Sequence, residues 1–438
     1  MARKILLIGV FTGVAHILSF YGVSFIVKMN ADKLFVSKIA EIESAIVVIL
    51  AIMSFGLQQV ATRDIAIKYN WKAILLTTQK TRFSMGIFLS LVGVLLYLFT
   101  NDIYYVIFFM APLIALNVDY ALYGRGLSIE ASFLSLIKVG VPAIILIILG
   151  YNKIFNLKYY IVSVFFAWII IGYFSNKRLN FFWFVKPTFG FFKSYFGNIK
   201  IGFTDIALTT LKLGILSLAK PFYDETIIAD AFVVLKLYIL VKGVQRVVFQ
   251  AFYKDLVSAQ KAFLIDKIGL IIGFLFFSIT LFYPNELILL VFSEDYLSSR
   301  HLFIMIGFAT LISSISISAS PRMLLISKDK AYINSYLYAF VGTLLFLFLA
   351  SNSNAVFYGI IGAILFGETI LNMSFFKVLK KEIFTKERFF FLIEIVVLFL
   401  LFTMVYFLLN TGLSILVNAV LFMVYGLYFM LKHKKQIL

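Results

Sequence analysis

The chain has 438 residues, of which 62% are hydrophobic and 14% charged, and its formal net charge is +18. A soluble domain of this length cannot bury so much apolar surface, so the composition excludes a soluble globular fold. It predicts an all-α polytopic membrane protein, because an open strand would leave backbone amides unsatisfied in lipid. The absence of cysteine excludes disulfides, thiolate metal sites and cysteine nucleophiles.

Apolar stretches recur along the whole sequence at lengths that match a bilayer, with about 17–23 residues each. Between twelve and fourteen spans are expected, and fourteen is the preferred number. The first is too long for a signal peptide and is expected to be an uncleaved span. The expected spans are 5–27, 39–60, 83–99, 103–123, 128–150, 157–175, 199–219, 227–249, 265–285, 300–320, 331–350, 355–376, 389–409 and 412–431.

The basic residues alternate between successive loops. Of the 39 Lys and Arg residues, 28 fall on the two termini and every second loop, and 7 fall on the loops between them. Basic residues favour the cytoplasmic side of a membrane. This bias predicts that both termini are cytoplasmic, and it accounts for most of the +18 charge without a nucleic-acid ligand.

A basic segment over 176–200 separates six expected helices from the next six. We therefore predict an N-terminal lobe over 1–180, a C-terminal lobe over 181–380 and an appended helix pair over 381–438. A short similarity supports a repeat, because Gly56-Leu57-Gln58-Gln59-Val60 and Gly243-Val244-Gln245-Arg246-Val247 end the second helix of each half.

Ionisable side chains inside spans are costly and often face a cavity or a partner. Lys138 and Lys236 lie near mid-span, while Lys242 and Arg246 share a helix face near the cytoplasmic end. These residues predict a cationic cavity for an anionic headgroup. The plainer interpretation is that they snorkel to the interface or form internal ion pairs, for example of Glu368 with a lysine.

Three further ionisable sites are considered. Asp205 and Lys212 are seven residues apart, which places both on one face of a continuous helix, and Lys212 has no clear role. Asp119 is expected to pair locally with Arg125. His16 is more consistent with packing than with proton transfer, and the histidines are too scattered for a metal cluster, so no metal or cofactor is expected.

Enzyme signatures such as a Walker A sequence, H-E-x-x-H or G-x-S-x-G do not occur. The sequence resembles the O-antigen and polysaccharide flippases of the multidrug/oligosaccharidyl-lipid/polysaccharide exporter (MOP) superfamily. The similar stretches are 55–66 (FGLQQVATRDIA), 228–237 (IADAFVVLKL) and 291–297 (VFSEDYL). The final helix pair departs from the twelve spans of that family and is similar to the peptidoglycan-precursor branch.

The resemblance implies a bilobed flippase with a central cavity between two six-helix lobes. It would move an undecaprenyl-diphosphate-linked oligosaccharide, such as an O-antigen or capsule repeat unit, from the cytoplasmic to the periplasmic leaflet of a bacterial inner membrane. Membrane lipids and a polysaccharide polymerase of the same pathway would be its partners. Predicted anion-binding residues are Arg63, Lys138, Lys212, Lys236, Lys242 and Arg246; Asp64, Asp205 and Glu368 are predicted to couple ions or orient these cations.

Two alternatives remain open. A cation-coupled multidrug or metabolite antiporter of the same fold would place acidic groups deep in the cavity, and the spans contain about as many acids as lysines. A membrane-embedded glycosyltransferase or polymerase would need a sizeable external catalytic loop, whereas the external loops are short.

Overall fold

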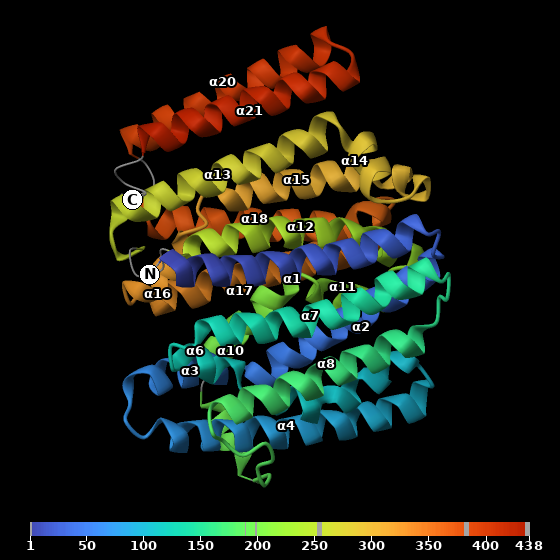
Figure 1. Ribbon diagram of the computed structural model, residues 1–438, viewed down its shortest axis with the longest axis vertical. Coiled ribbons are helices and arrows are strands. Elements are labelled where there is room, and N and C mark those ends of the chain that lie inside the picture. Colours follow the sequence, from blue (N-terminus) through green and yellow to red (C-terminus); the bar gives the residue numbers. More distant parts are fainter. Residues whose placement is uncertain (1, 189, 198, 252–255, 381–384, 434–438) are drawn as a thin grey trace.

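The computed structural model describes residues 2–188, 190–197, 199–251, 256–380 and 385–433, and all regular structure in these ranges is helical. The long helices lie side by side along one direction (Figure 1). They are α1 (Ala2–Lys28), α2 (Lys33–Ser54), α4 (Trp71–Thr100), α7 (Ser128–Tyr151), α8 (Leu157–Arg178), α12 (Glu225–Ala251), α13 (Ala259–Phe282), α15 (Arg300–Ser314), α17 (Asp329–Ser351), α18 (Gly359–Val378), α20 (Lys386–Leu408) and α21 (Thr411–Lys432).

Short helices fill the breaks between the long ones. They are α3 (Leu57–Ile67), η1 (Ile103–Met110), α5 (Ala111–Ala115), α6 (Asp119–Gly124), α9 (Phe191–Phe196), α10 (Ile199–Thr210), α11 (Gly214–Ala219), α14 (Pro284–Val291), η3 (Glu294–Ser299), α16 (Ala319–Leu325) and η4 (Val356–Tyr358).

Within the described residues, eleven segments are long and apolar enough to cross a membrane, and a twelfth is obtained if α2 and α3, bent by 56°, form one span. The prediction of an all-α polytopic membrane protein is confirmed. Two of the fourteen expected spans do not meet this measure. The span over 199–219 is divided between α10 and α11, and the span over 227–249 lies on α12, which is long enough but carries several charges.

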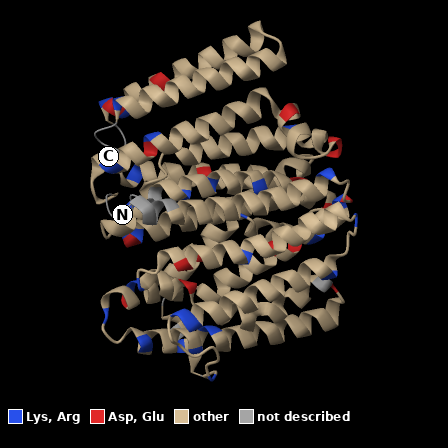
Figure 2. Ribbon diagram, viewed as in Figure 1, with Lys and Arg blue, Asp and Glu red and all other residues tan. Residues whose placement is uncertain are grey.

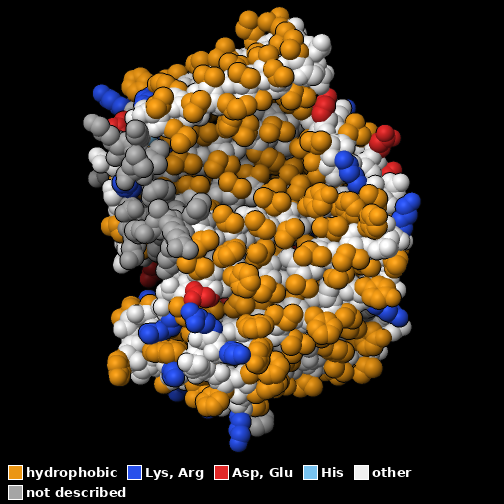
Figure 3. Space-filling model, viewed as in Figure 1, with side chains coloured by type: hydrophobic (Ala, Val, Ile, Leu, Met, Phe, Trp, Pro, Cys, Tyr) orange, Lys and Arg blue, Asp and Glu red, His pale blue; other side chains and the backbone are white. Residues whose placement is uncertain are grey.

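α1 begins and α21 ends at the same end of the bundle, on the left of Figure 1. We call this the terminal end, and the basic-residue bias predicts that it is cytoplasmic; the other is the opposite end. Charged residues concentrate near both ends (Figure 2), and the face between them is largely apolar (Figure 3). This distribution fits a molecule whose middle lies in hydrocarbon.

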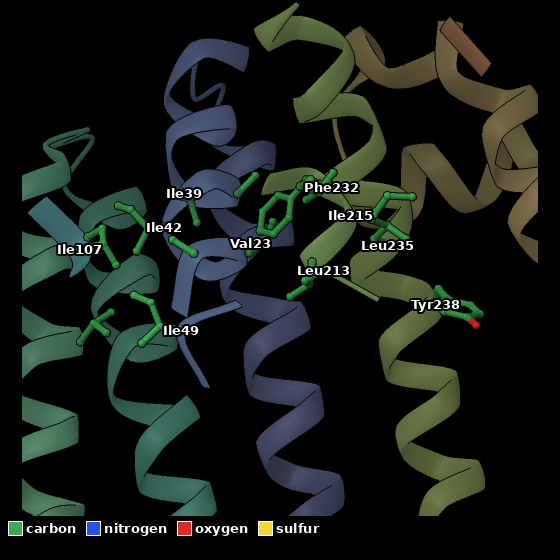
Figure 4. Packing of buried hydrophobic residues seen from close by; sticks show 14 of the residues in the cluster. Val23, Ile39, Ile42, Ile49, Ile107, Leu213, Ile215, Phe232, Leu235 and Tyr238 are labelled. Carbon is green, nitrogen blue, oxygen red and sulfur yellow. The ribbon is translucent and has the colours of Figure 1, made fainter. Parts of the chain in front are cut away.

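The largest buried cluster joins the two halves of the sequence. It includes Val23 on α1, Ile39 on α2, Ile215 on α11 and Phe232 on α12, all nearly inaccessible (Figure 4). The N-terminal and C-terminal halves therefore meet through a packed apolar contact in this conformation. The lobe boundaries at 180 and 380 remain a prediction.

The expected span over 103–123 is interrupted, and a buried arginine supports the interruption. The Arg82 side chain on α4 is fully buried and donates hydrogen bonds to the Asn117 carbonyl at 2.6 Å and the Gln79 side chain at 2.9 Å. Its guanidinium also lies 5.1 Å from the ring centre of Tyr120 on α6. Arg82 thus satisfies carbonyl groups that the break between α5 and α6 leaves free.

Replacing Arg82 with methionine is expected to destabilise the protein by about 3–5 kcal/mol, because the break would keep buried acceptors without donors. Thermal unfolding of the purified protein in detergent measures the effect. Lys80→Met, two residues away on the same helix, is the control and should leave the melting temperature nearly unchanged. Equal melting temperatures for Arg82→Met and the native chain would contradict this role.

Candidate functional site

A group of basic side chains gathers where α12 faces the break between α10 and α11. Lys212 lies in the turn between these short helices, and Arg246 lies near the end of α12; both side chains are exposed. The charge of Lys212 is close enough to those of Lys242, Arg246 and Glu368 to interact with them. We call these four residues the α12 cluster, and three of the four are cationic.

Only one cation of the α12 cluster is neutralised by a carboxylate within the described residues. The Lys242 Nζ atom lies 3.4 Å from the Glu368 Oε1 atom on α18. The Tyr238 hydroxyl donates to the same carboxylate, which is buried. No ion pair in the described ranges involves Lys212 or Arg246, so these two side chains carry unneutralised, accessible positive charge.

α1 approaches the α12 cluster closely because α12 has a glycine at the contact. A Cβ atom on Gly243 would come within 2.5 Å of the His16 imidazole. His16 is also close enough to Lys212 and Arg246 to feel their charges. The histidine therefore borders the cluster and packs against α12, in agreement with the packing interpretation from sequence.

Lys236, one of the predicted anion-binding residues, is buried and already paired. Its Nζ atom donates to the Glu43 carboxylate on α2 and to the Ser19 hydroxyl on α1 at 2.8 Å. Tyr160 on α8 donates to the same Glu43 at 3.1 Å. This contact is the internal ion pair that the plainer interpretation from sequence allowed. An anionic ligand would have to displace Glu43, and the anion-binding role of Lys236 stays a prediction.

Lys138 lies beside Asp119, which the sequence analysis had paired with Arg125. Its Nζ atom lies 4.0 Å from the Asp119 carboxylate and 5.2 Å from the Trp168 ring centre. Arg125 lies over Trp71 instead, at 4.8 Å, so the expected Asp119–Arg125 pair is wrong. The turn at 125–127 directs the arginine toward α4, whereas α7 brings Lys138 back beside α6.

The Lys138–Asp119 pair borders the same region as Arg246. Tyr123 on α6 is close enough to both Asp119 and Arg246 to interact with their charges. Tyr123 therefore links the Lys138–Asp119 pair of the N-terminal half to Arg246 of the C-terminal half, and Lys212 interacts with the charge of the same arginine.

Arg63 and Asp64 on α3 form a separate group. The Arg63 Nε atom lies 3.4 Å from Asp64, whose other oxygen accepts from Lys68 at 2.7 Å. The Arg63 side chain is two-thirds exposed. Within the described residues, no hydrogen bond or ion pair joins these side chains to the α12 cluster, so their role stays a prediction.

Asp205 holds the bend between α2 and α3. Gly56 has a positive φ of 76°, and Asp205 accepts hydrogen bonds from its N–H at 2.9 Å and from the Gln59 side chain at 2.5 Å. The expected common face with Lys212 is lost because the helix breaks between them. The two sequence segments that suggested a repeat, at Gly56 and at Gly243, also differ in structure. The chain bends at Gly56 between α2 and α3, whereas α12 continues through Gly243.

Ion pairs connect the two halves at the opposite end, and their acids are absent from the predicted site. Lys220, after α11, lies 2.9 Å from Glu41 on α2 and 2.6 Å from Asp102. Lys38 lies 3.1 Å from Glu41 and 2.7 Å from Glu225 at the start of α12. We call these five residues the opposite-end network. Glu41 could have been found from sequence, because it falls inside the span expected over 39–60.

No family model and no curated protein matches the sequence. Solved structures with similar folds include the lipid II flippase MurJ in an inward closed conformation, with a TM-score of 0.62 and 14% identity over 99% of this chain and 100% of that chain. An outward-facing multidrug resistance MATE family transporter of the MOP superfamily gives 0.57 and 12% identity, over 87% of this chain and 95% of that chain. A MOP superfamily transporter from Pyrococcus furiosus gives 0.52 and 12%, with the same shares.

The chain has the fold of MOP superfamily transporters. The match to MurJ covers nearly the whole of this chain. The MATE matches leave part of this chain unmatched, and that part is about as long as the C-terminal helix pair. These identities are low, and the likeness is one of fold.

Proposed function

We propose that this protein is a flippase of the MOP superfamily type, which carries an undecaprenyl-diphosphate-linked oligosaccharide from the cytoplasmic to the external leaflet of a bacterial inner membrane. The observation that carries the proposal is the excess of accessible positive charge in the α12 cluster. Lys212 and Arg246 have no carboxylate partner in the described residues, and a diphosphate is a ligand that such cations bind well.

The opposite-end network supports a transport cycle. Its ion pairs join elements from both halves of the chain, so separating the halves at that end breaks these contacts. The α12 cluster lies farther along α12 toward the terminal end. We propose that the substrate enters from the terminal end while the network is formed, and leaves when the network opens.

A cation-coupled antiporter of the same fold is the second candidate, and one observation favours it. Glu368 is a buried acid beside Tyr238 and Lys242, which is a suitable group for exchanging a proton or an inorganic cation. In the flippase proposal Glu368 instead positions Lys242.

Deletion of the gene in its native host tests the proposal. We expect loss of a surface polysaccharide, accumulation of single lipid-linked repeat units on the cytoplasmic leaflet, and rescue by a plasmid copy. A polymerase would use the translocated product as its substrate. Unchanged polysaccharide together with new sensitivity to cationic drugs would reject the flippase and favour the antiporter.

A further inference from the structure

A groove of about 690 Å³ lies between α13 and the start of α20, near the terminal end of the bundle. Its apolar lining includes Leu270 from α13 and Phe390 and Leu392 from α20. Phe390 and Leu392 are 63% and 42% exposed, so both present apolar surface to whatever fills the groove. Figure 1 shows the pair α20 and α21 set apart from the other helices along this side.

The charged residues of the groove leave an excess of positive charge. Arg388 forms an ion pair with the buried Asp266, and Asp266 also accepts from the Ser318 N–H at 2.9 Å. This ion pair connects α20 to α13, and its two charges cancel each other. Lys267 and Lys386 also line the groove, and neither forms an ion pair within the described residues.

Lys267 forms no ion pair within the described residues, although the carboxylates of Glu387 and Glu394 on α20 are close enough to interact with its charge. Glu394 is already paired with Lys432, at 2.9 Å. The Lys267 Nζ atom lies 4.3 Å from the ring centre of Phe263 and 5.4 Å from that of Phe391. These contacts orient the ammonium group at the groove and leave its charge available to an anion.

Charge and apolar surface are ordered along the groove. Lys386 is the first residue of α20, and Phe390 and Leu392 follow one to two turns deeper. On α13, Lys267 likewise precedes Leu270. A ligand that fits this order has an anionic headgroup at the membrane interface and hydrocarbon chains directed into the bilayer.

We propose that this groove binds an anionic phospholipid of the cytoplasmic leaflet, with its phosphate on Lys267 and Lys386 and its acyl chains against α13 and α20. A free anion would leave the apolar wall uncovered. A polyprenyl tail whose diphosphate occupied the α12 cluster would leave both lysines without a partner. The inference is independent of the proposed transport activity.

The test is native mass spectrometry of the purified full-length protein in a neutral detergent, with phosphatidylglycerol and phosphatidylcholine of equal chain length. We expect the native chain to prefer phosphatidylglycerol. The preference should fall about fivefold for each of Lys267→Gln and Lys386→Gln, which corresponds to about 1 kcal/mol per lysine. The control variant Lys330→Gln/Lys377→Gln removes two exposed cations near the same end of the bundle and should keep the preference.

Two results would overturn the proposal. One is an undiminished phosphatidylglycerol preference in Lys267→Gln/Lys386→Gln, provided that the variant elutes and melts like the native chain. The other is competition, in which inorganic phosphate or undecaprenyl phosphate displaces phosphatidylglycerol at equal concentration, because the site would then belong to a free anion or to the substrate. Neither readout depends on transport.

Discussion

Arg246→Gln is expected to lower transport of the lipid-linked substrate by roughly tenfold to a hundredfold and to leave the fold intact. A hydrogen bond to a charged group contributes about 1.5–3 kcal/mol, and every 1.4 kcal/mol is a factor of ten. The Arg246 side chain is exposed and has no carboxylate partner in the described residues. Its replacement therefore leaves no buried carboxylate without a counter-ion. Lys212→Gln should have a similar effect for the same reason.

The measurement is flipping of lipid-linked oligosaccharide in proteoliposomes that contain equal amounts of each variant. Arg246→Lys keeps the charge and should retain part of the activity, because a lysine binds a phosphate as a point charge without the guanidinium geometry. Lys330→Gln removes an exposed lysine elsewhere and should be neutral. Native flipping by Arg246→Gln/Lys212→Gln would contradict the assigned site.

Lys236 and Lys242 are less decisive residues for this test. Replacing either one leaves a carboxylate, Glu43 or Glu368, without its cation, and breaking a buried ion pair of this kind costs about 3–5 kcal/mol. Lost transport in such a variant could result from lost stability. The double variant Lys236→Met/Glu43→Met removes both charges and is the appropriate comparison for that pair.

Helix positions could be predicted from sequence because hydropathy and length determine them. The breaks at 116–118 and 211–213 could not, because each contains a single polar residue, Asn117 or Lys212, within an otherwise apolar stretch. In the first break, Arg82 from a different helix, α4, donates a hydrogen bond to the Asn117 carbonyl that the break leaves free. In the second, Lys212 occupies the turn and faces the charges of α12 and α18.

Ion-pair partners were less predictable than the ionisable residues themselves. The pairing of Glu368 with a lysine was one of the interpretations, and Lys242 is that lysine. The partner of Lys236 is Glu43, 193 positions away in sequence, and such a contact depends on how α2 packs against α12. Sequence spacing predicts only neighbours on one helix, and it therefore misassigned Asp119 to Arg125.

Joining Ser44 on α2 to Ser217 on α11 by a disulfide is expected to stop transport reversibly. The hydroxyl groups of these residues are in direct contact, and the Tyr104 hydroxyl donates to Ser217 at 3.0 Å. Side chains that meet in this way can satisfy the short Cβ separation that a disulfide requires. Because the native chain has no cysteine, the bond in Ser44→Cys/Ser217→Cys would be the only possible intramolecular one.

The oxidised double variant should lose at least about tenfold in transport rate, because a protein fixed in one of two alternating states cannot complete a cycle. Protection of both thiols from a maleimide reagent reports bond formation, and a reductant should restore labelling and transport together. Ser44→Cys and Ser217→Cys alone control for the substitutions.

Ser44 lies one turn from Glu41, so the cross-link and the opposite-end network restrain the same contact between the two halves. Lys220→Met should act in the opposite direction, because it removes the cation shared by Glu41 and Asp102 and favours separation at that end. We therefore expect the disulfide to form more slowly in Ser44→Cys/Ser217→Cys/Lys220→Met than in Ser44→Cys/Ser217→Cys. Full transport by the fully cross-linked protein would show that this end does not open during the cycle.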